Sequence, residues 1–180
     1  MGLLAKAEAE KKYPGARFAG PVRIGSDVLI RSNVRIGSGV SIGSGVWVGY
    51  GVSIGSDVLI GDGVWVGSET IIGDGTSIGE GARVGPFTTT AAETIVPPGA
   101  HITSSLRNVT AALAINGIVN DKKSSAIACD KGLIIYIGCM NDYQGLPPDE
   151  AREEIAKKYS DDHPYFMAID LAERWYETIN

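Results

Sequence analysis

The sequence predicts an all-β solenoid, and two features of the chain support that fold class. Glycine is unusually frequent, at 24 of 180 residues, about twice its ordinary share of roughly 7%. Residues 22–105 divide into fourteen consecutive six-residue units without one insertion or deletion. The third position of the unit is Ile or Val in thirteen cases, and the fourth is Gly in ten. Because β-branched residues recur at a fixed phase, the tract differs from a disordered glycine-rich linker.

Each unit has the pattern of a short strand followed by a corner. Positions one to three alternate between apolar and variable residues, as a strand with one buried face does. Positions four to six are rich in Gly, Ser, Asp and Asn, which tolerate positive φ or bond their own backbone. Three units complete a triangular coil, so residues eighteen apart should stack at roughly 4.8 Å, the spacing of neighbouring strands. The prediction is a parallel β-helix filled by columns of Val and Ile.

The run of [Ile/Val]-Gly-x-x-[Val/Thr/Ala]-x units resembles the hexapeptide-repeat family, part of an acyltransferase-like superfamily. The resemblance covers about half of the chain. It implies a left-handed parallel β-helix that assembles as a homotrimer. The left-handedness is implied only by the resemblance, because the spacing of the repeats does not determine handedness. The usual rule for crossover connections favours right-handedness.

The sequence predicts three parts. An N-terminal capping helix occupies residues 1–21, the hexapeptide-repeat β-helix residues 22–107, and an α/β appendage residues 108–180. Residues 3–13 are helix-like, and Pro14-Gly15 would end that short helix. Because the end of a β-helix exposes strand edges and apolar core, this helix is expected to cover one end.

The C-terminal appendage is predicted to contain a β-hairpin that turns at residues 130–132. In the predicted register Cys129 pairs with Leu133, and Cys139 lies opposite Lys123. The two thiols therefore do not face each other, and no disulfide is expected.

The rest of the appendage is predicted to be helical. Residues 147–159 have an acidic start and a basic end, which suits a helix dipole. A second helix should begin near Pro164, and its apolar stripe fits core or subunit contact. The apolar residues 111–119 are expected to close the C-terminal end of the tube.

Charge and hydropathy disfavour several classes of partner. The net charge of −5 and the pI near 5.0 would repel nucleic acid polymers and anionic membranes. No apolar run reaches about 18 residues, so no membrane span is expected. The first eight residues are too charged for a signal peptide, and a cytoplasmic protein is expected.

The outward middle positions of the units should sort onto three walls when every eighteenth residue is followed. The first wall presents Leu29, Trp47, Trp65, Arg83 and His101. The second presents Arg35, Ser53, Ile71, Thr89 and Arg107, and the third presents Ser41, Leu59, Ser77 and Ile95.

The two tryptophans make the first wall the candidate site. Each Trp can bury roughly 150–250 Å², so the pair should be covered, either by another subunit or by the chain's own tail. Alternatively the pair is a stacking platform for a flat ligand such as a nucleobase, with Arg83 near a phosphate. The predicted ligand-binding residues are Trp47, Trp65, Arg83 and His101. Both interpretations hold together if the ligand lies between subunits.

The resemblance also implies an enzyme alternative, an acyltransferase that takes acyl-CoA or an acyl carrier and uses a histidine as general base. His101 projects from the repeats and is the candidate catalytic base, with Glu69 and Glu93 at corners as candidate partners. Family acyltransferases often carry a long loop between coils, and the fourteen units contain none. His163 precedes Pro164, where it fits a helix-capping or loop role.

Other chemistries have less support. The chain has two histidines, too few for the three-histidine zinc site of the family's carbonic anhydrases, so no metal is expected. Cys139 with His163 is an alternative nucleophile–base pair. The leading hypothesis is a non-catalytic trimeric scaffold or small-ligand binding module with intersubunit grooves, a nucleotide-like ligand and no required cofactor. The acyltransferase is the second hypothesis, and a structural protein of a phage or surface assembly the third.

Overall fold

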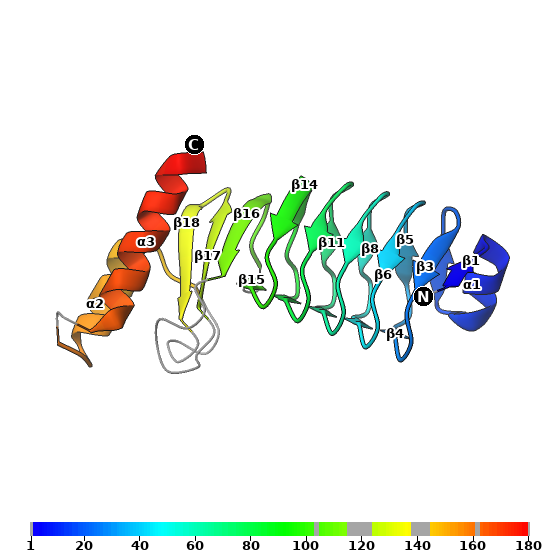
Figure 1. Cartoon of the computed structure of the whole chain (residues 1–180), viewed down its shortest axis with the longest axis horizontal. Coiled ribbons are helices and arrows are strands. Elements are labelled where there is room, and N and C mark those ends of the chain that lie inside the picture. The colour runs from blue at the N-terminus through cyan, green and yellow to red at the C-terminus, as the bar shows by residue number, and fades with distance from the viewer. Residues whose placement is uncertain (1, 103–104, 115–123, 138–144, 161–162, 180) are drawn as a thin grey trace.

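The computed structural model describes residues 2–102, 105–114, 124–137, 145–160 and 163–179. These residues form a left-handed parallel β-helix of about five coils, which confirms the predicted fold class. Figure 1 shows the coils stacked along the long axis of the molecule. Helix α1 (Lys6–Lys12) lies at the N-terminal end, and α2 (Pro148–Ala156) and α3 (Pro164–Ile179) lie beyond the C-terminal end.

The three walls of the tube are three sheets, named here for what they carry. The tryptophan wall consists of β4 (Leu29–Ile30), β7 (Trp47–Val48), β10 (Trp65–Val66), β13 (Arg83–Val84) and β15 (His101–Ile102). The arginine wall consists of β2 (Ala16–Phe18), β5 (Val34–Ile36), β8 (Ser53–Ile54) and β11 (Ile71–Ile72). The long wall consists of β1 (Gly2–Leu4), β3 (Val22–Ile24), β6 (Ser41–Ile42), β9 (Leu59–Ile60), β12 (Ser77–Ile78), β14 (Thr90–Val96), β16 (Val109–Ala114), β17 (Ser124–Cys129) and β18 (Gly132–Ile137).

The predicted eighteen-residue register is confirmed on each wall. Successive Cα partners on the tryptophan wall are Leu29, Trp47, Trp65, Arg83 and His101. On the other walls they are Arg35, Ser53, Ile71 and Thr89, and Ser41, Leu59, Ser77 and Ile95. The Thr89 N–H donates to Leu106 O at 2.8 Å, which brings Arg107 next to Thr89. Because β2 pairs with β5, the coiled walls begin one unit before Val22.

The N-terminal end is covered by a strand and a short helix. The strand β1 pairs antiparallel with β3, with Leu3 opposite Arg23, so the helix predicted over residues 3–13 is wrong in its first turn. The local sequence favours a helix, but the edge of β3 offers unpaired backbone groups that β1 satisfies. Helix α1 follows, and its Ala9 is fully buried in the tube core beside Tyr13. The predicted short helix is therefore present and covers the core.

Glycine fills the fourth position of most units because the next coil passes close to it. At Gly67 an added Cβ would lie 2.4 Å from Pro86 N and 2.8 Å from Gly85 C, both backbone atoms. Glycine at the sixth position has another cause. Gly81 has a φ of 65° and nothing within 4 Å of an added Cβ. Close approach therefore selects the first glycine, and left-handed backbone selects the second.

Replacing Gly67 by Ala should lower the free energy of unfolding by about 1–3 kcal/mol, because the methyl group must displace backbone rather than a flexible side chain. The matched control is Gly81→Asn, since Asn tolerates left-handed backbone and the site is open. That control should change stability by about 0.5 kcal/mol or less. Denaturant unfolding measures both variants, and a Gly67→Ala protein as stable as the parent would contradict the close approach.

Buried threonine hydroxyls replace part of the apolar interior in the later coils. Thr70 is fully enclosed and donates to a backbone carbonyl of the next coil at 3.0 Å. Thr94 donates to Val109 O at 2.8 Å, and Thr90 accepts from the Gly73 N–H at 2.9 Å. Among the described residues no buried side-chain N or O atom lacks a partner, so the polar core is satisfied.

The register changes where the tube ends. Thr90 faces Val109, nineteen residues on, whereas Ile95 faces Ala111, sixteen residues on. β16 therefore follows a shorter path than β14 between the two pairs, and the chain leaves the coil there. Its outer edge pairs antiparallel with β17, which in turn pairs with β18. Residues 111–114 thus extend the long wall as a strand rather than forming the predicted cap, and residues 115–119 lie outside the described residues.

The hairpin of β17 and β18 packs on the tube end with one face and carries the helices on the other. Ile127 and Ile134 belong to the apolar core of the tube. Ala126, Leu133 and Ile135 instead pack with buried residues of α2 and α3. Figure 1 shows the hairpin between the last coil and the two helices. The C-terminal end is therefore covered by a two-faced hairpin.

The register of that hairpin differs from the prediction by one residue. Cys129 lies opposite Gly132 rather than Leu133. Gly132 has a φ of 88°, so it closes a two-residue turn from within β18 instead of belonging to the turn. Cys139 and Lys123, the other predicted pair, lie outside the described residues.

The two C-terminal helices pack against each other and against β18. The apolar stripe predicted on the last helix is buried over its first half, at Tyr165, Ala168, Ile169 and Ala172. Arg152 of α2 pairs with Asp170 at 2.8 Å and also with Glu173 of α3. No helix in the described ranges is long and apolar enough to cross a membrane.

Candidate functional site

The tryptophan wall brings all four predicted site residues into one column. Trp47, Trp65, Arg83 and His101 follow one another at intervals of one coil. Because neighbouring strands lie about 4.8 Å apart, the column from Trp65 to His101 spans roughly 10 Å. The sequence pattern sets this order, since each side chain occupies the outward middle position of its unit.

The two indole rings are stacked face to face. Their centroids lie 5.0 Å apart and their planes are 4° from parallel. The rings are therefore related mainly by the one-coil translation, and each covers a face of the other. Trp47 is half-buried and Trp65 is 36% exposed. A flat ligand can stack only on an outer face of the pair, and the outer face of Trp65 lies toward Arg83.

Arg83 supplies a positive charge in the next coil on that side of the stack. Its side chain is exposed, and no acidic side chain of the described residues pairs with it. It also makes no cation–π contact with a described ring. Arginine presents planar, bidentate donors that suit phosphate or carboxylate groups. The wall therefore offers a ring face and an oxyanion donor in neighbouring coils.

His101 ends the column at the C-terminal side. It is half-buried, and its backbone N–H donates to the buried Ser125 Oγ of the hairpin at 2.8 Å. The candidate partners are not brought to it. Glu69 lies at the corner after Trp65, two coils away from His101. Glu93 lies at the corner between the arginine and long walls. Within one chain the structure therefore groups His101 with Arg83, not with either glutamate.

The remaining predicted groups lie in the appendage. His163 precedes α3, where its Nδ1 accepts from the Tyr165 N–H at 3.4 Å and its ring lies 4.2 Å from that of Tyr159. This geometry fits the predicted capping role. Cys139, its proposed partner as nucleophile, lies outside the described residues. Burial raises the pKa of the half-buried Cys129 thiol, which makes it a poor nucleophile at neutral pH.

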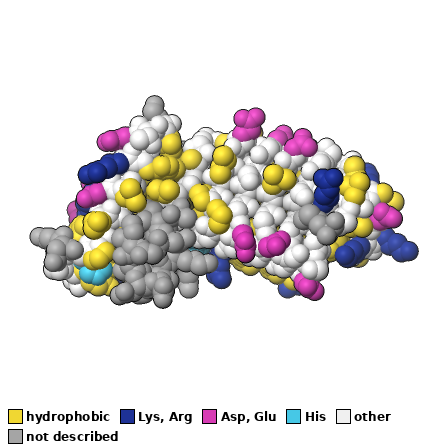
Figure 2. Space-filling view, in the orientation of Figure 1, with side chains coloured by type: hydrophobic (Ala, Val, Ile, Leu, Met, Phe, Trp, Pro, Cys, Tyr) yellow, Lys and Arg dark blue, Asp and Glu magenta, His cyan; other side chains and the backbone are white. Residues whose placement is uncertain are grey.

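Large apolar side chains are exposed on all three walls. They are Leu29 on the tryptophan wall, Ile71 on the arginine wall, and Leu59 and Ile95 on the long wall, each at least 45% exposed. Figure 2 shows hydrophobic side chains on one face as separate groups among polar and backbone surface. The described residues contain no group of three or more His, Cys, Asp or Glu arranged to hold a metal ion.

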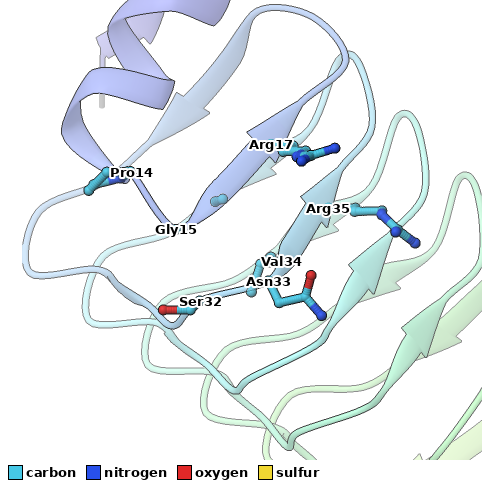
Figure 3. A pocket seen from close by; sticks show the side chains of 8 residues that line it. Pro14, Gly15, Arg17, Ser32, Asn33, Val34 and Arg35 are labelled. Atoms are coloured by element: carbon cyan, nitrogen blue, oxygen red, sulfur yellow. The ribbon is translucent and has the colours of Figure 1, made fainter.

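Sequence reasoning missed two hollows at the N-terminal end of the tube. The first has a volume of about 320 Å³ and is lined by Arg17, Asn33 and Arg35 among others (Figure 3). The second, of about 420 Å³, is lined by Lys12 and Arg31 among others, and it shares the corner around Pro14 with the first. The sequence contained a sign of the first hollow, because Arg17 and Arg35 are eighteen residues apart. Arg17, however, lies one unit before the repeat that was recognised from Val22.

The chain is similar to several solved structures of transferases. It is 21% identical to the acetyltransferase domain of PglB from Neisseria gonorrhoeae, over 52% of this chain and 51% of that one, with a TM-score of 0.39. It is 28% identical to PerB from Caulobacter crescentus in complex with CoA and GDP-perosamine, over 55% and 51% of the two chains, with a TM-score of 0.33. It is 24% identical to UDP-N-acetylglucosamine acyltransferase from Campylobacter jejuni, over 52% and 48%, with a TM-score of 0.41.

The chain matches about half the length of each of these proteins. No curated protein sequence matches it significantly. Residues 57–92 match the family model described as bacterial transferase hexapeptide (six repeats). These residues form two complete coils of the left-handed β-helix. The match and the uninterrupted units around it show that the chain carries hexapeptide repeats, which form its β-helix.

Proposed function

We propose that the tryptophan wall binds a small molecule that carries a flat aromatic ring and an anionic group, as a nucleotide does. One observation carries this proposal. The Trp47–Trp65 stack ends at Trp65, which is 36% exposed, and the exposed Arg83 follows one coil later. Stacking on an aromatic ring contributes roughly 1–3 kcal/mol per base. The arginine adds the charge-assisted contact that fixes the ligand's orientation.

The ligand would lie in grooves between three copies of the chain. A wall of two-residue strands is flat, and both hollows described above lie at the N-terminal end. A second copy would supply the other side of the groove. It would also cover exposed apolar side chains such as Leu29 and Ile71, which lie on different walls. A homotrimer therefore gives both the groove and the cover that the tryptophans need.

Acyl transfer from acyl-CoA is the second candidate, favoured by the match to a transferase family model. In this reaction His101 would take the proton of an acceptor hydroxyl or amine as that atom attacks the thioester carbonyl. The tetrahedral intermediate would then expel the CoA thiolate, which leaves with the proton. Acyl-CoA carries an adenine ring and phosphates, so it also fits the ring and cation of the tryptophan wall.

The ligand proposal is tested by titrating the full chain with CoA and with ATP, read by calorimetry. Trp65→Ala should weaken binding by about 5–150-fold, the equivalent of one lost stacking contact. The control is Leu59→Ala, an equally outward apolar residue on the long wall, which should change the affinity by less than about twofold. Equal losses in the two variants, or no binding by either compound, would contradict the proposal.

The assembly is tested by sedimentation. We expect a trimer at micromolar concentration, and tryptophan fluorescence that added CoA partly protects from a soluble quencher. A monomer at that concentration would rule out a site between subunits. A trimer that binds neither compound would leave a purely structural protein as the better interpretation.

A further inference from the structure

Two arginines lie side by side on the arginine wall. Arg17 of β2 and Arg35 of β5 are Cα partners in parallel strands, which lie about 4.8 Å apart. Both side chains are exposed. Figure 3 shows both leaving the wall on the same side, with the side chain of Asn33 toward that side as well. Like charges directly opposite each other in a sheet are destabilising, so an anion between the two side chains would stabilise the pair.

No acidic side chain of the described residues supplies such an anion. The ion pairs found there all lie in the appendage, between α2 and α3 or within the α2 region. The acid nearest in sequence to Arg17 with a described contact is Glu10, whose carboxylate accepts from the Phe18 N–H at 3.4 Å. The two guanidinium groups therefore face solvent with their donors available.

Charge along the chain is strongly uneven. Residues 1–35 contain seven Lys and Arg against three Asp and Glu, whereas residues 36–100 contain one against six. Figure 2 shows Lys and Arg side chains at the N-terminal end of the tube and acidic side chains over its middle. A basic end on an acidic protein concentrates anions there.

The arginines line a hollow rather than a flat surface. The hollow of about 320 Å³ is bounded by the corner at Pro14 and Gly15 and by Asn33. This corner is tightly packed, since a Cβ on Gly15 would lie 2.9 Å from Ser32 Cα. The backbone that carries the arginines is therefore held in place.

We propose that this hollow is a site for the phosphoryl group of a small molecule. One arginine is enough to bind a carboxylate bidentately, because a carboxylate presents two oxygens. Two arginine forks and an amide match a group with two negative charges and three terminal oxygens, which is a phosphoryl group. The site shares no residue with the tryptophan wall, so its variants test it separately from the ligand site proposed above.

The test is calorimetric titration of the full chain at low ionic strength with inorganic phosphate, phenyl phosphate and acetate. Arg17→Gln and Arg35→Gln should each raise the dissociation constant of both phosphates about tenfold, the loss expected for one charge-assisted contact. The matched control is Arg23→Gln, which removes the same charge from an exposed outward position of β3 on the long wall. It should change the constant by less than about twofold.

Each other outcome has a defined meaning. If all three variants bind phosphate equally weakly, the binding depends on overall charge rather than on the hollow, and the proposal is overturned. It is also overturned if neither phosphate compound binds at about ten millimolar. Acetate binding as tightly as phosphate would overturn the assignment of the hollow to a phosphoryl group. Binding of inorganic phosphate but not of phenyl phosphate would show that the hollow does not accept a phosphoryl group attached to a larger molecule, which would also overturn the proposal. If a Gln variant does not fold, Arg17→Lys replaces it in the test. This variant keeps the positive charge but removes the planar donors of the guanidinium, and it should still weaken phosphate binding.

Discussion

Replacing Ile127 by Ala should lower the free energy of unfolding by about 2–5 kcal/mol, the largest stability effect that we expect from one substitution. Ile127 is fully buried and belongs to the apolar core of the tube, although it lies in the hairpin beyond the last coil. Its Cα partner Ile134 belongs to the same core. Truncating Ile127 therefore opens a cavity between the hairpin and the tube.

The control is Ile179→Ala, the same chemical change at an exposed end of α3. It should alter stability by about 0.5 kcal/mol or less. Hydrogen exchange adds a second readout, because loosening of the hairpin should reduce protection in β17 and β18 more than in the middle coils. If Ile127→Ala unfolds at the same denaturant concentration as the control, the hairpin does not stabilise the tube end.

The central coils could be predicted in detail because one local rule repeats. A three-residue strand and a three-residue corner determine both the wall and the outward side chain, so the neighbours of Trp65 follow from counting. The sequence also predicted that glycines lie at corners because they tolerate positive φ, which holds at Gly81. At Gly67 the cause is instead the backbone of the next coil, which a single unit does not reveal.

Prediction failed at two places, and at one of them a distant partner decides the local structure. Leu3 and Leu4 lie in a helix-forming stretch, but they pair with the edge of β3. Gly132 resembles a turn residue, but pairing with Cys129 places it in β18. At Leu3 and Leu4 the backbone hydrogen bonds with β3 override a helix preference worth under about 1 kcal/mol per residue. At Gly132 the cause is local, because the tight turn and the φ of 88° set the register of the hairpin.

The order of the candidate residues along the wall could be predicted, but the arrangement of their side chains could not. Register placed Trp47 next to Trp65, yet the stacking of the rings, which leaves a ring face only at each end, depends on side-chain angles that no period encodes. The hollow beside Arg17 and Arg35 was missed because a cavity arises from the packing of a corner against the next coil. The glutamates proposed near His101 lie elsewhere because they occupy corners of other coils or other edges.

If the chain is an acyltransferase, His101→Ala should reduce acetyl transfer from acetyl-CoA by about 10²–10⁴-fold, the usual contribution of a general base. The physical reason is that the acceptor must lose a proton as it attacks the thioester, and His101 is the imidazole that the tryptophan wall presents. The affinity for CoA should change much less, because Trp65 and Arg83 remain. Single-turnover rates with calorimetric binding constants separate the two effects.

His163→Ala is the control, because it removes the other histidine of the chain, which lies at the start of α3. Equal transfer by His101→Ala and the parent would remove His101 from the chemistry. CoA binding that still depended on Trp65 would then identify the tryptophan wall as a binding surface without catalysis.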